Sequence, residues 1–165
     1  MSDYKVVDNF LEKEELKDLQ LIYENNMDFP WFYSGQVAGD WEEQTEIFYL
    51  IHLLYVEDKP NSQYYDLFIK PFLNKKFWNS LIRVKLNNYP NQNKFIEHAP
   101  HKDYDFEHKG ALFCLNTCDG YTKMHDGKKI SSIENRMIFF DPTKEHSSTN
   151  TIGHNNRFNL NFNYI

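Results

Sequence analysis

The residues best suited to chemistry in this chain are two histidines and an aspartate in its second half. His101 and Asp103 are separated by one residue, and His146 follows much later in the sequence. If His101 lies on a strand, Asp103 points to the same face, because side chains along a strand alternate with period two. His146 can then close a third corner. Two imidazoles and one carboxylate on one face of a metal leave three positions open, which is the ligand set typical of non-haem Fe(II).

The last predicted strand alternates strictly between polar and apolar residues. Its polar face carries Arg157, Asn159, Asn161 and Asn163. Its apolar face carries Phe158, Leu160, Phe162 and Tyr164. Inward polar residues cost stability unless they line a site, whereas a solvated face of an edge strand is the usual reason for alternation. Because a guanidinium forms a bidentate pair with a carboxylate, Arg157 is the candidate anchor for an anionic ligand.

The order of these residues is more specific than any of them alone, since a lone His-x-Asp arises often by chance. With His-x-Asp, a distal His and then an Arg, the chain resembles the 2-oxoglutarate- and Fe(II)-dependent dioxygenases, and among them the prolyl 4-hydroxylase-like branch. The resemblance covers most of the chain and is strongest from Leu81 to Ile165. It implies that His101, Asp103 and His146 hold Fe(II) and that Arg157 binds the distal carboxylate of 2-oxoglutarate.

Two further positions match the pattern of these dioxygenases. In related enzymes a Tyr, sometimes with an Asn two residues before it, hydrogen-bonds the cosubstrate, and Asn87 and Tyr89 match that arrangement. The gap from Tyr89 to His101 is longer than usual. One departure is Asn135, which stands where the family often has a Gly; Asn tolerates the same left-handed backbone. The resemblance therefore assigns Asn87 and Tyr89 to the cosubstrate site.

The activity implied by the resemblance is hydroxylation. Such an enzyme consumes 2-oxoglutarate and O2 and releases succinate and CO2, with ascorbate as a further candidate cofactor. The expected substrate is a peptide side chain, as in prolyl hydroxylases, or a small molecule. The alternative is a non-catalytic cupin-type module, in which the same three residues hold a structural metal or bind a ligand. Such a module would not need Arg157, so this arginine discriminates between the two interpretations.

Length, charge and cysteines narrow the class of protein. The 165 residues suffice for one domain with a sizeable core, so we expect a single dioxygenase domain over residues 1–165. The net charge of -6 argues against nucleic acid as a partner, because phosphate backbones need a basic face. No apolar run is long enough to cross a bilayer, and no signal peptide is visible. Cys114 and Cys118 match no zinc spacing and fit packing thiols, so we expect a cytoplasmic protein.

The expected architecture is mainly β with flanking helices. Apolar residues recur at helical spacing from Glu12 to Asn25 and from Ser62 to Leu73, while Glu46–Val56 and Leu81–Tyr89 fit strands. Shorter strands are expected at Gly110–Leu115, Tyr121–Lys123, Lys128–Ser132 and Arg136–Asp141. Many short strands with few helices indicate a sandwich or a small jelly roll. The resemblance implies a double-stranded β-helix with the N-terminal helices packed outside it.

Residues around these elements carry weaker signals. Met27–Thr45 combines Pro, Gly and aromatic residues, which indicates a structured loop rather than a linker. It is either a cover over the core edge or a wall of the substrate mouth, and it is the candidate lid. His98, Asp105 and His108 lie close to the metal-ligand candidates. We expect them to support the site or to face solvent, not to bind the metal, since His98 is an odd number of residues from His101.

Overall fold

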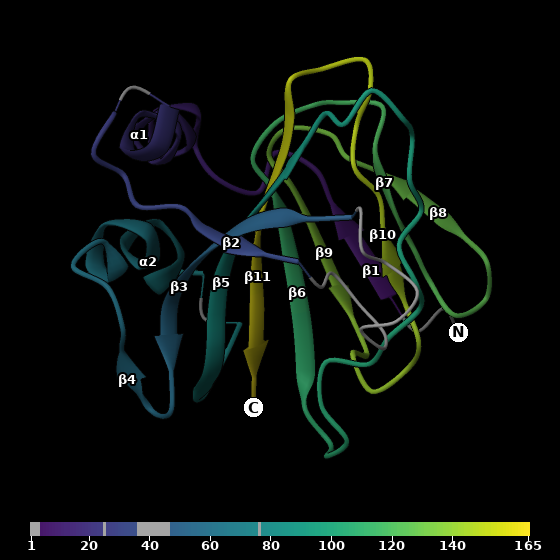
Figure 1. The fold of residues 1–165 in the computed structure, drawn as a ribbon. Helices are drawn as coiled ribbons and strands as arrows, with labels where there is room; N and C mark the ends of the chain where they lie inside the picture. The colour runs from purple at the N-terminus through teal and green to yellow at the C-terminus, as the bar shows by residue number, and fades with distance from the viewer. Residues whose placement is uncertain (1–3, 25, 36–46, 76) are drawn as a thin grey trace.

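The computed structural model of the chain describes residues 4–24, 26–35, 47–75 and 77–165 (Figure 1). Within them the chain forms two helices and two β-sheets. In chain order the elements are β1 (Tyr4–Val7), α1 (Lys13–Glu24), β2 (Phe32–Ser34), β3 (Tyr49–Val56), β4 (Lys59–Pro60), α2 (Tyr65–Leu73), β5 (Leu81–Pro90), β6 (Lys109–Cys114), β7 (Tyr121–Lys123), β8 (Lys129–Ser131), β9 (Arg136–Phe140), β10 (Ser147–Ser148) and β11 (Asn156–Tyr164).

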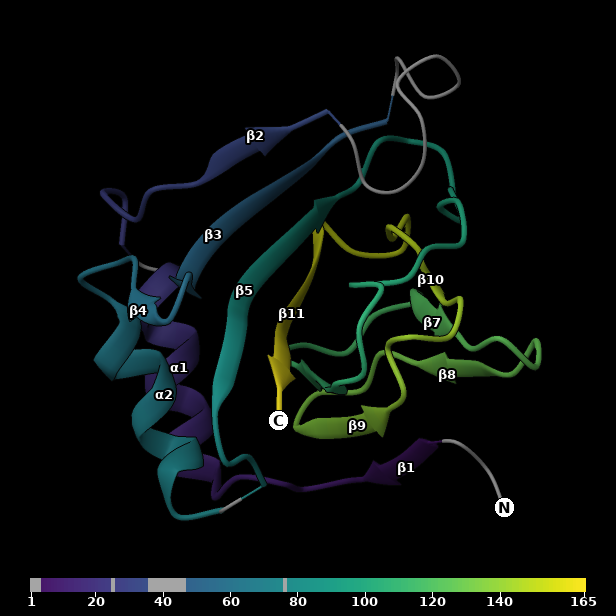
Figure 2. The ribbon, with the colours of Figure 1, turned by 90° about the horizontal axis from the view of Figure 1, so that it is seen from below.

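The two sheets differ in size and face each other. In the described ranges, eight strands form a large antiparallel sheet in the order β1-β9-β6-β11-β5-β3-β2, with β4 paired to β3. A small sheet has the order β10-β7-β8. Figure 2 shows that the large sheet curves, with the small sheet on its inner side and both helices against its outer side. This is a double-stranded β-helix with helices packed outside, so the predicted fold is confirmed.

The strand β11 lies in the middle of the large sheet, between β5 and β6. Its polar row consists of Arg157, Asn159, Asn161 and Asn163. In the register of the sheet these residues lie opposite the polar row of β5, in the order Tyr89, Asn87, Lys85 and Arg83. All four polar residues of β11 are buried. The polar row of β11 is therefore not the solvent-exposed face of an edge strand. Together the two polar rows form one continuous surface inside the fold.

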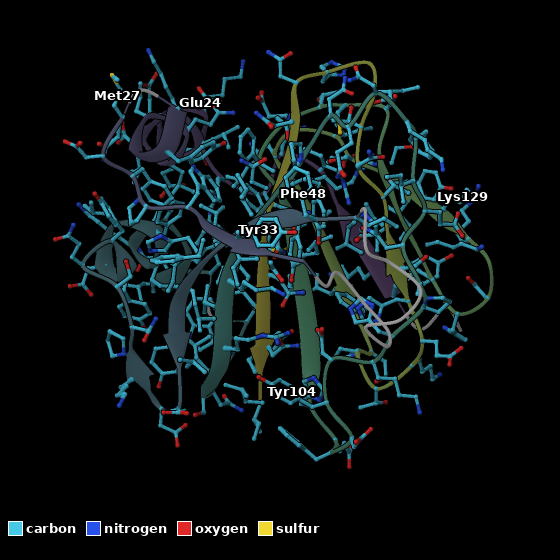
Figure 3. All side chains as sticks on the ribbon, in the orientation of Figure 1. Glu24, Met27, Tyr33, Phe48, Tyr104 and Lys129 are labelled. Carbon is cyan, nitrogen blue, oxygen red and sulfur yellow. The ribbon has the colours of Figure 1, made fainter. Side chains whose placement is uncertain are left out.

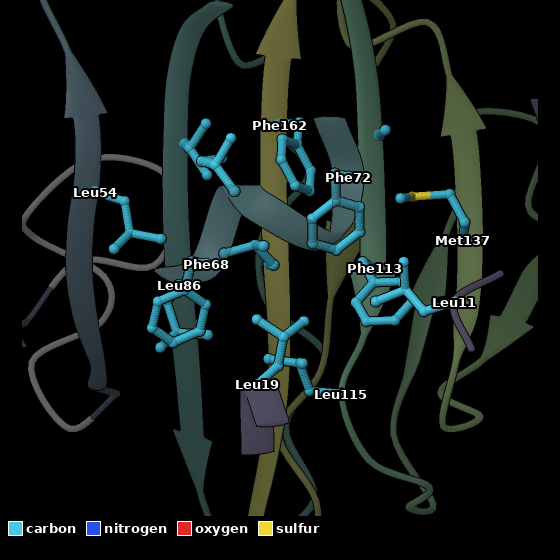
Figure 4. Packing of buried hydrophobic residues seen from close by; sticks show 14 of the residues in the cluster. Leu11, Leu19, Leu54, Phe68, Phe72, Leu86, Phe113, Leu115, Met137 and Phe162 are labelled. Carbon is cyan, nitrogen blue, oxygen red and sulfur yellow. The ribbon is translucent and has the colours of Figure 1, made fainter. Parts of the chain in front are cut away.

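The opposite face of β11 packs on the helices. Phe162 contacts Phe72 of α2 with ring centroids 5.0 Å apart, and Phe72 also meets Phe113 of β6 at 5.2 Å. From α1, Leu19 reaches the same cluster (Figure 4). Burying a side chain of this size contributes about 1.5–3 kcal/mol relative to leaving it exposed. The apolar face thus anchors β11 to the helices and fixes which face carries the polar row.

The observed helices are slightly shorter than predicted. α2 begins at Tyr65 rather than at Ser62, because the Ser62 hydroxyl accepts from the Tyr64 N–H in a turn that precedes the helix. α1 begins at Lys13, and residue 25 lies outside the described residues. Pro71 lies inside α2, which ends two residues later at Leu73. Both helices occupy the predicted places in the chain.

The segment Met27–Thr45 contains a strand that was not predicted. Phe32–Ser34 forms β2, which pairs with β3, so the expectation of an irregular loop is wrong for these residues. The signal was the aromatic content, which favours strands. Tyr33 is exposed and stacks on Phe48 at 5.6 Å between ring centroids (Figure 3). Residues 36–46 lie outside the described part of the chain, and with them most of the candidate lid.

Asn135 holds the N-terminal segment in place. Its backbone has φ 62°, in the left-handed region, as expected for the position where related proteins often have Gly. Its side-chain amide accepts from the Leu11 N–H and donates to the Leu11 carbonyl, both at 2.8 Å. The left-handed turn therefore aims the Asn135 side chain at the chain entering α1.

Two expectations from the sequence concern the cysteines and membrane-spanning segments. Cys114 and Cys118 are buried free thiols, and burial raises the pKa of Cys114. No helix in the described ranges is long and apolar enough to cross a membrane.

Candidate metal centre and ligand cavity

The structure brings His101, Asp103 and His146, here called the triad, to one place. Each offers one ligand atom, and these atoms lie within 4.8 Å of one another. In the described part of the chain no other group of three His, Cys, Asp or Glu side chains does so. His101 and His146 form an isolated β-bridge with N–H···O distances of 2.9 and 3.0 Å. A single bridge, rather than the strand considered from the sequence, aligns the two imidazoles.

Both histidines of the triad present a nitrogen suited to a metal. Burial, and after it the charge that His146 can carry, lower the pKa of His101 to about 4. The ring is therefore neutral near pH 7. The Nδ1 of His146 lies 3.0 Å from the Lys144 carbonyl, so an Nδ1–H donates there and leaves Nε2 free. Neutral imidazoles are the form that metals bind.

Asp103 is held ionised by its neighbours. Arg83 donates to one carboxylate oxygen at 3.1 Å and Asn163 donates to the other at 2.7 Å. Burial by itself raises the pKa of Asp103, but Arg83, His146 and the Asn163 hydrogen bond outweigh it and bring the pKa to about 2. The Arg83 guanidinium also lies 5.0 Å from the ring centre of Tyr104, near the lower end of the sheet in Figure 3. An ionised carboxylate has further lone pairs, so a metal can bind it beside these two donors.

Arg157 is a fully buried cation on the same inner surface. It donates to the Thr149 carbonyl and to the Thr122 hydroxyl, both at 2.9 Å, and its guanidinium lies 5.4 Å from the ring centre of Tyr89. Its Nε has no hydrogen-bond partner, and no carboxylate among the described residues pairs with it. Since an unpaired buried charge is costly, this environment suits an anionic ligand.

Gly120 leaves room for the Arg157 side chain. A Cβ at Gly120 would lie 2.6 Å from Cδ of Arg157 and 2.7 Å from the Asn150 carbonyl. Only a residue without a side chain allows this approach. The hairpin that contains Thr122 can therefore close over Arg157.

Tyr89 and Asn87 both line the cavity near the triad. Tyr89 stacks on Tyr49 at 5.2 Å and on His98 at 5.3 Å between ring centroids. Asn87 donates to Asn159 at 2.8 Å, which leaves its side-chain oxygen buried without a partner. Tyr89 is thus fixed between two rings, while Asn87 retains an acceptor toward the site.

Two further histidines lie close to these residues. His98 is buried, its Nδ1 lies 2.8 Å from the Ser148 hydroxyl, and burial lowers its pKa to about 3. His108 is also buried and lies 3.3 Å from the side chain of Asn163, which holds Asp103. Both histidines are buried, so solvent exposure is wrong for them, and support of the site stays a prediction. Asp105 is exposed.

A small cavity lies between the two sheets at this point. Its volume is about 40 Å³, which exceeds the roughly 10–15 Å³ that a cavity needs to hold one water. Its lining comprises Tyr49, Lys85, Asn87, Tyr89, His101, Asp103, Leu112, Thr122, Phe140, His146, Ser148, Asn159 and Asn161. The triad and the surroundings of Arg157 therefore share one cavity.

Comparison with known proteins shows which fold this is. No family model and no curated protein sequence matches the chain. Among solved structures, a 2-oxoglutarate-Fe(II) oxygenase family oxidoreductase from Burkholderia pseudomallei is similar, with a TM-score of 0.68 and 13% identity over 98% of this chain and 84% of that one. The match extends over nearly the whole described sheet structure, so the likeness is one of complete folds.

Two prolyl hydroxylases share the fold as well. One, from Trichoplax adhaerens, was solved with a peptide fragment of the hypoxia inducible factor oxygen degradation domain; its TM-score is 0.66 at 14% identity over 99% of this chain and 83% of that one. The other is a viral collagen prolyl hydroxylase from Paramecium bursaria Chlorella virus-1 in complex with 2-oxoglutarate, with a TM-score of 0.60 at 15% identity over 99% and 97%. The chain has the fold of the 2-oxoglutarate- and Fe(II)-dependent oxygenases.

Proposed function

We propose that this chain is an Fe(II)- and 2-oxoglutarate-dependent dioxygenase that hydroxylates a peptide side chain or a small molecule and releases succinate and CO2. One observation carries the proposal. The triad lines the same cavity as Tyr89 and Thr122, which contact the buried Arg157. A metal site and a cation without a carboxylate partner thus lie together inside a fold shared with such enzymes.

The triad has the donor set that Fe(II) requires. Two imidazoles and one carboxylate that stays ionised offer three ligand atoms within 4.8 Å of one another. When bound, Fe(II) together with 2-oxoglutarate supplies the activation of O2 that hydroxylation needs. The work of the chain is to hold these groups in place. Arg83 and Asn163 fix the carboxylate of Asp103, and the Lys144 carbonyl fixes the ring of His146.

Arg157 is the proposed anchor for the distal carboxylate of 2-oxoglutarate. Two of its five N–H donors are used by Thr149 and Thr122, which orients the remaining ones. Tyr89 lies under the guanidinium and confines the carboxylate, while the free acceptor of Asn87 faces the cavity. Leu112 and Phe140 form apolar parts of the lining. Apolar walls exclude water and strengthen the charge pair at Arg157.

The substrate class in this proposal is a peptide or a small molecule. The Trichoplax enzyme of the same fold binds a peptide fragment, which supports the peptide option. Ascorbate as an accessory cofactor and a cytoplasmic location remain predictions; two buried free thiols are compatible with a reducing compartment.

The direct test is turnover of 2-oxoglutarate. The purified protein is incubated with Fe(II), O2 and 2-oxoglutarate, with and without proline-containing peptides, and succinate is measured. We expect succinate that depends on Fe(II) and rises with a true substrate. Absence of 2-oxoglutarate binding and of succinate under all conditions would refute the enzyme assignment.

A further inference from the structure

Lys85 is a cation of the cavity to which the proposed function gives no role. It lies on β5 opposite Asn161 of β11, and it lines the cavity together with the triad residues His101 and Asp103. The side chain is partly buried, and burial together with the nearby Arg83 charge lowers the pKa of Lys85. A lysine usually avoids such a position, because its stem allows the ammonium to reach water.

Among the described residues, the ammonium of Lys85 hydrogen-bonds to no anion, although the charge of the nearby Asp103 acts on it. It has three N–H donors, and its one hydrogen bond among the described residues goes to the Tyr49 hydroxyl at 3.3 Å. The carboxylate of the cavity belongs to Asp103, and both of its oxygens already accept hydrogen bonds from Arg83 and Asn163. Two of the three donors of Lys85 therefore have no hydrogen-bond acceptor among the described residues.

The charges around the cavity are unbalanced. Among the described residues, Lys85 and Asp103 line the cavity, and Arg83 and Arg157 donate hydrogen bonds to side chains of the lining. The formal charges of these four side chains sum to +2. If the proposed function is correct, a divalent metal raises this to +4, and a 2-oxoglutarate dianion returns it to +2. Positive charge in a low-dielectric site attracts a further anion.

The position of Lys85 separates it from Arg157. Lys85 lies opposite Asn161 and Arg157 lies opposite Tyr89, so the two cations are four residues apart along the paired strands. At about 3.3 Å per residue, their backbones are roughly 13 Å apart. A carboxylate at Arg157 is therefore distinct from one at Lys85.

We propose that Lys85 is a second carboxylate-binding residue of this cavity, separate from Arg157. The carboxylate comes either from the substrate, which is then acidic, or from the end of 2-oxoglutarate that does not bind Arg157. The naming of substrate and 2-oxoglutarate as the two sources rests on the proposed function. The binding chemistry of Lys85 itself rests only on the contacts of its ammonium.

The first arm of the test measures 2-oxoglutarate. Lys85→Met keeps the length of the side chain without its charge, Lys85→Arg keeps the charge, and Lys17→Met on the outer face of α1 is the matched control. Calorimetry of 2-oxoglutarate binding is done on the anaerobic Fe(II) protein. If the cosubstrate is the partner, Lys85→Met weakens binding by roughly tenfold or more, as expected for a lost charged hydrogen bond, and Lys85→Arg recovers most of it.

The second arm uses acetate as the probe. Acetate is titrated into the metal-free protein and into the anaerobic Fe(II) protein saturated with 2-oxoglutarate, and the melting temperature is compared with chloride at the same ionic strength. If the substrate supplies the carboxylate, acetate stabilises the saturated parent and the Lys17→Met control but not Lys85→Met. The 2-oxoglutarate affinity of Lys85→Met is then unchanged.

Each result decides the proposal. If Lys85→Met binds 2-oxoglutarate more weakly, or is no longer stabilised by acetate, the proposal is supported and the source of the carboxylate is identified. If Lys85→Met matches the parent in both arms, Lys85 binds no carboxylate and the proposal is overturned. If the parent binds no 2-oxoglutarate, the proposed function fails, and the acetate titration of the metal-free parent and Lys85→Met still decides the role of Lys85.

Discussion

Replacing Arg157 should separate cosubstrate binding from metal binding. Arg157 is fully buried and is not a member of the triad. Removing one partner of a buried charge pair costs about 3–5 kcal/mol, and about 1.4 kcal/mol corresponds to a factor of ten. We therefore expect Arg157→Ala to weaken 2-oxoglutarate binding by roughly a hundredfold or more, with little change in Fe(II) affinity.

The assay is a titration of 2-oxoglutarate into the anaerobic Fe(II) protein, followed through the metal-to-ligand charge-transfer band. Arg157→Lys should recover part of the loss, because it keeps the charge but not the planar fork. Alanine also leaves the Thr149 carbonyl and the Thr122 hydroxyl without their donor, so urea unfolding must show that the variant is folded.

Equal affinity of Arg157→Ala and the parent protein for 2-oxoglutarate would refute the anchor assignment. If the parent itself binds no 2-oxoglutarate, the non-catalytic binding module becomes the better explanation of the triad.

Three further predictions follow from the geometry. Alanine at any member of the triad should lower Fe(II) affinity severely without unfolding the protein, whereas His108→Ala should change it little; anaerobic equilibrium dialysis compares them, and equal losses would show that the wrong cluster was chosen. Gly120→Ala would bring a methyl group to 2.6 Å from Arg157, so it should weaken 2-oxoglutarate binding while circular dichroism stays unchanged; unchanged affinity would count against this contact. The metal-free protein should lose stability as the pH falls from 7 to 5. His98 has a pKa of about 3 when folded and an ordinary value of 6.5, so over this range the unfolded chain takes up the proton. The loss from His98 is about 2 kcal/mol at pH 5, and His98→Phe should remove that share in urea titrations; an unchanged pH dependence would contradict the burial of a neutral ring.

The fold and the triad were accessible from the sequence because both leave local patterns. Strict alternation marked the two faces of β11, and the apolar face proved to pack on the helices. The order of His101, Asp103, His146 and Arg157 placed four polar groups that the fold brings to one inner surface. The alternation can be read from the sequence because side chains along any strand point to opposite faces in turn.

Other parts of the site depend on pairings between distant segments. Alternate residues of β5 face the same side of the sheet. The row that contains Asn87 and Tyr89 therefore also contains Arg83 and Lys85, which were not assigned to the site from the sequence. The contact of Arg83 with Asp103 could not be predicted, since it requires the path of residues 98–103 across the sheet. That path makes single bridges rather than a strand, so counting odd and even offsets from His101 gives no reliable position for His98.

The central place of β11 has a consequence for how the protein acquires its structure. β11 follows every other strand in the sequence, yet it joins β5 to β6 in the middle of the large sheet. During synthesis those two strands leave the ribosome first, with edges that have no partner until β11 arrives. Contacts of such large sequence separation make folding slow and expose open edges to aggregation. The sheet and the ligand cavity are then completed in one late step, so a substitution that delays the docking of β11 delays both.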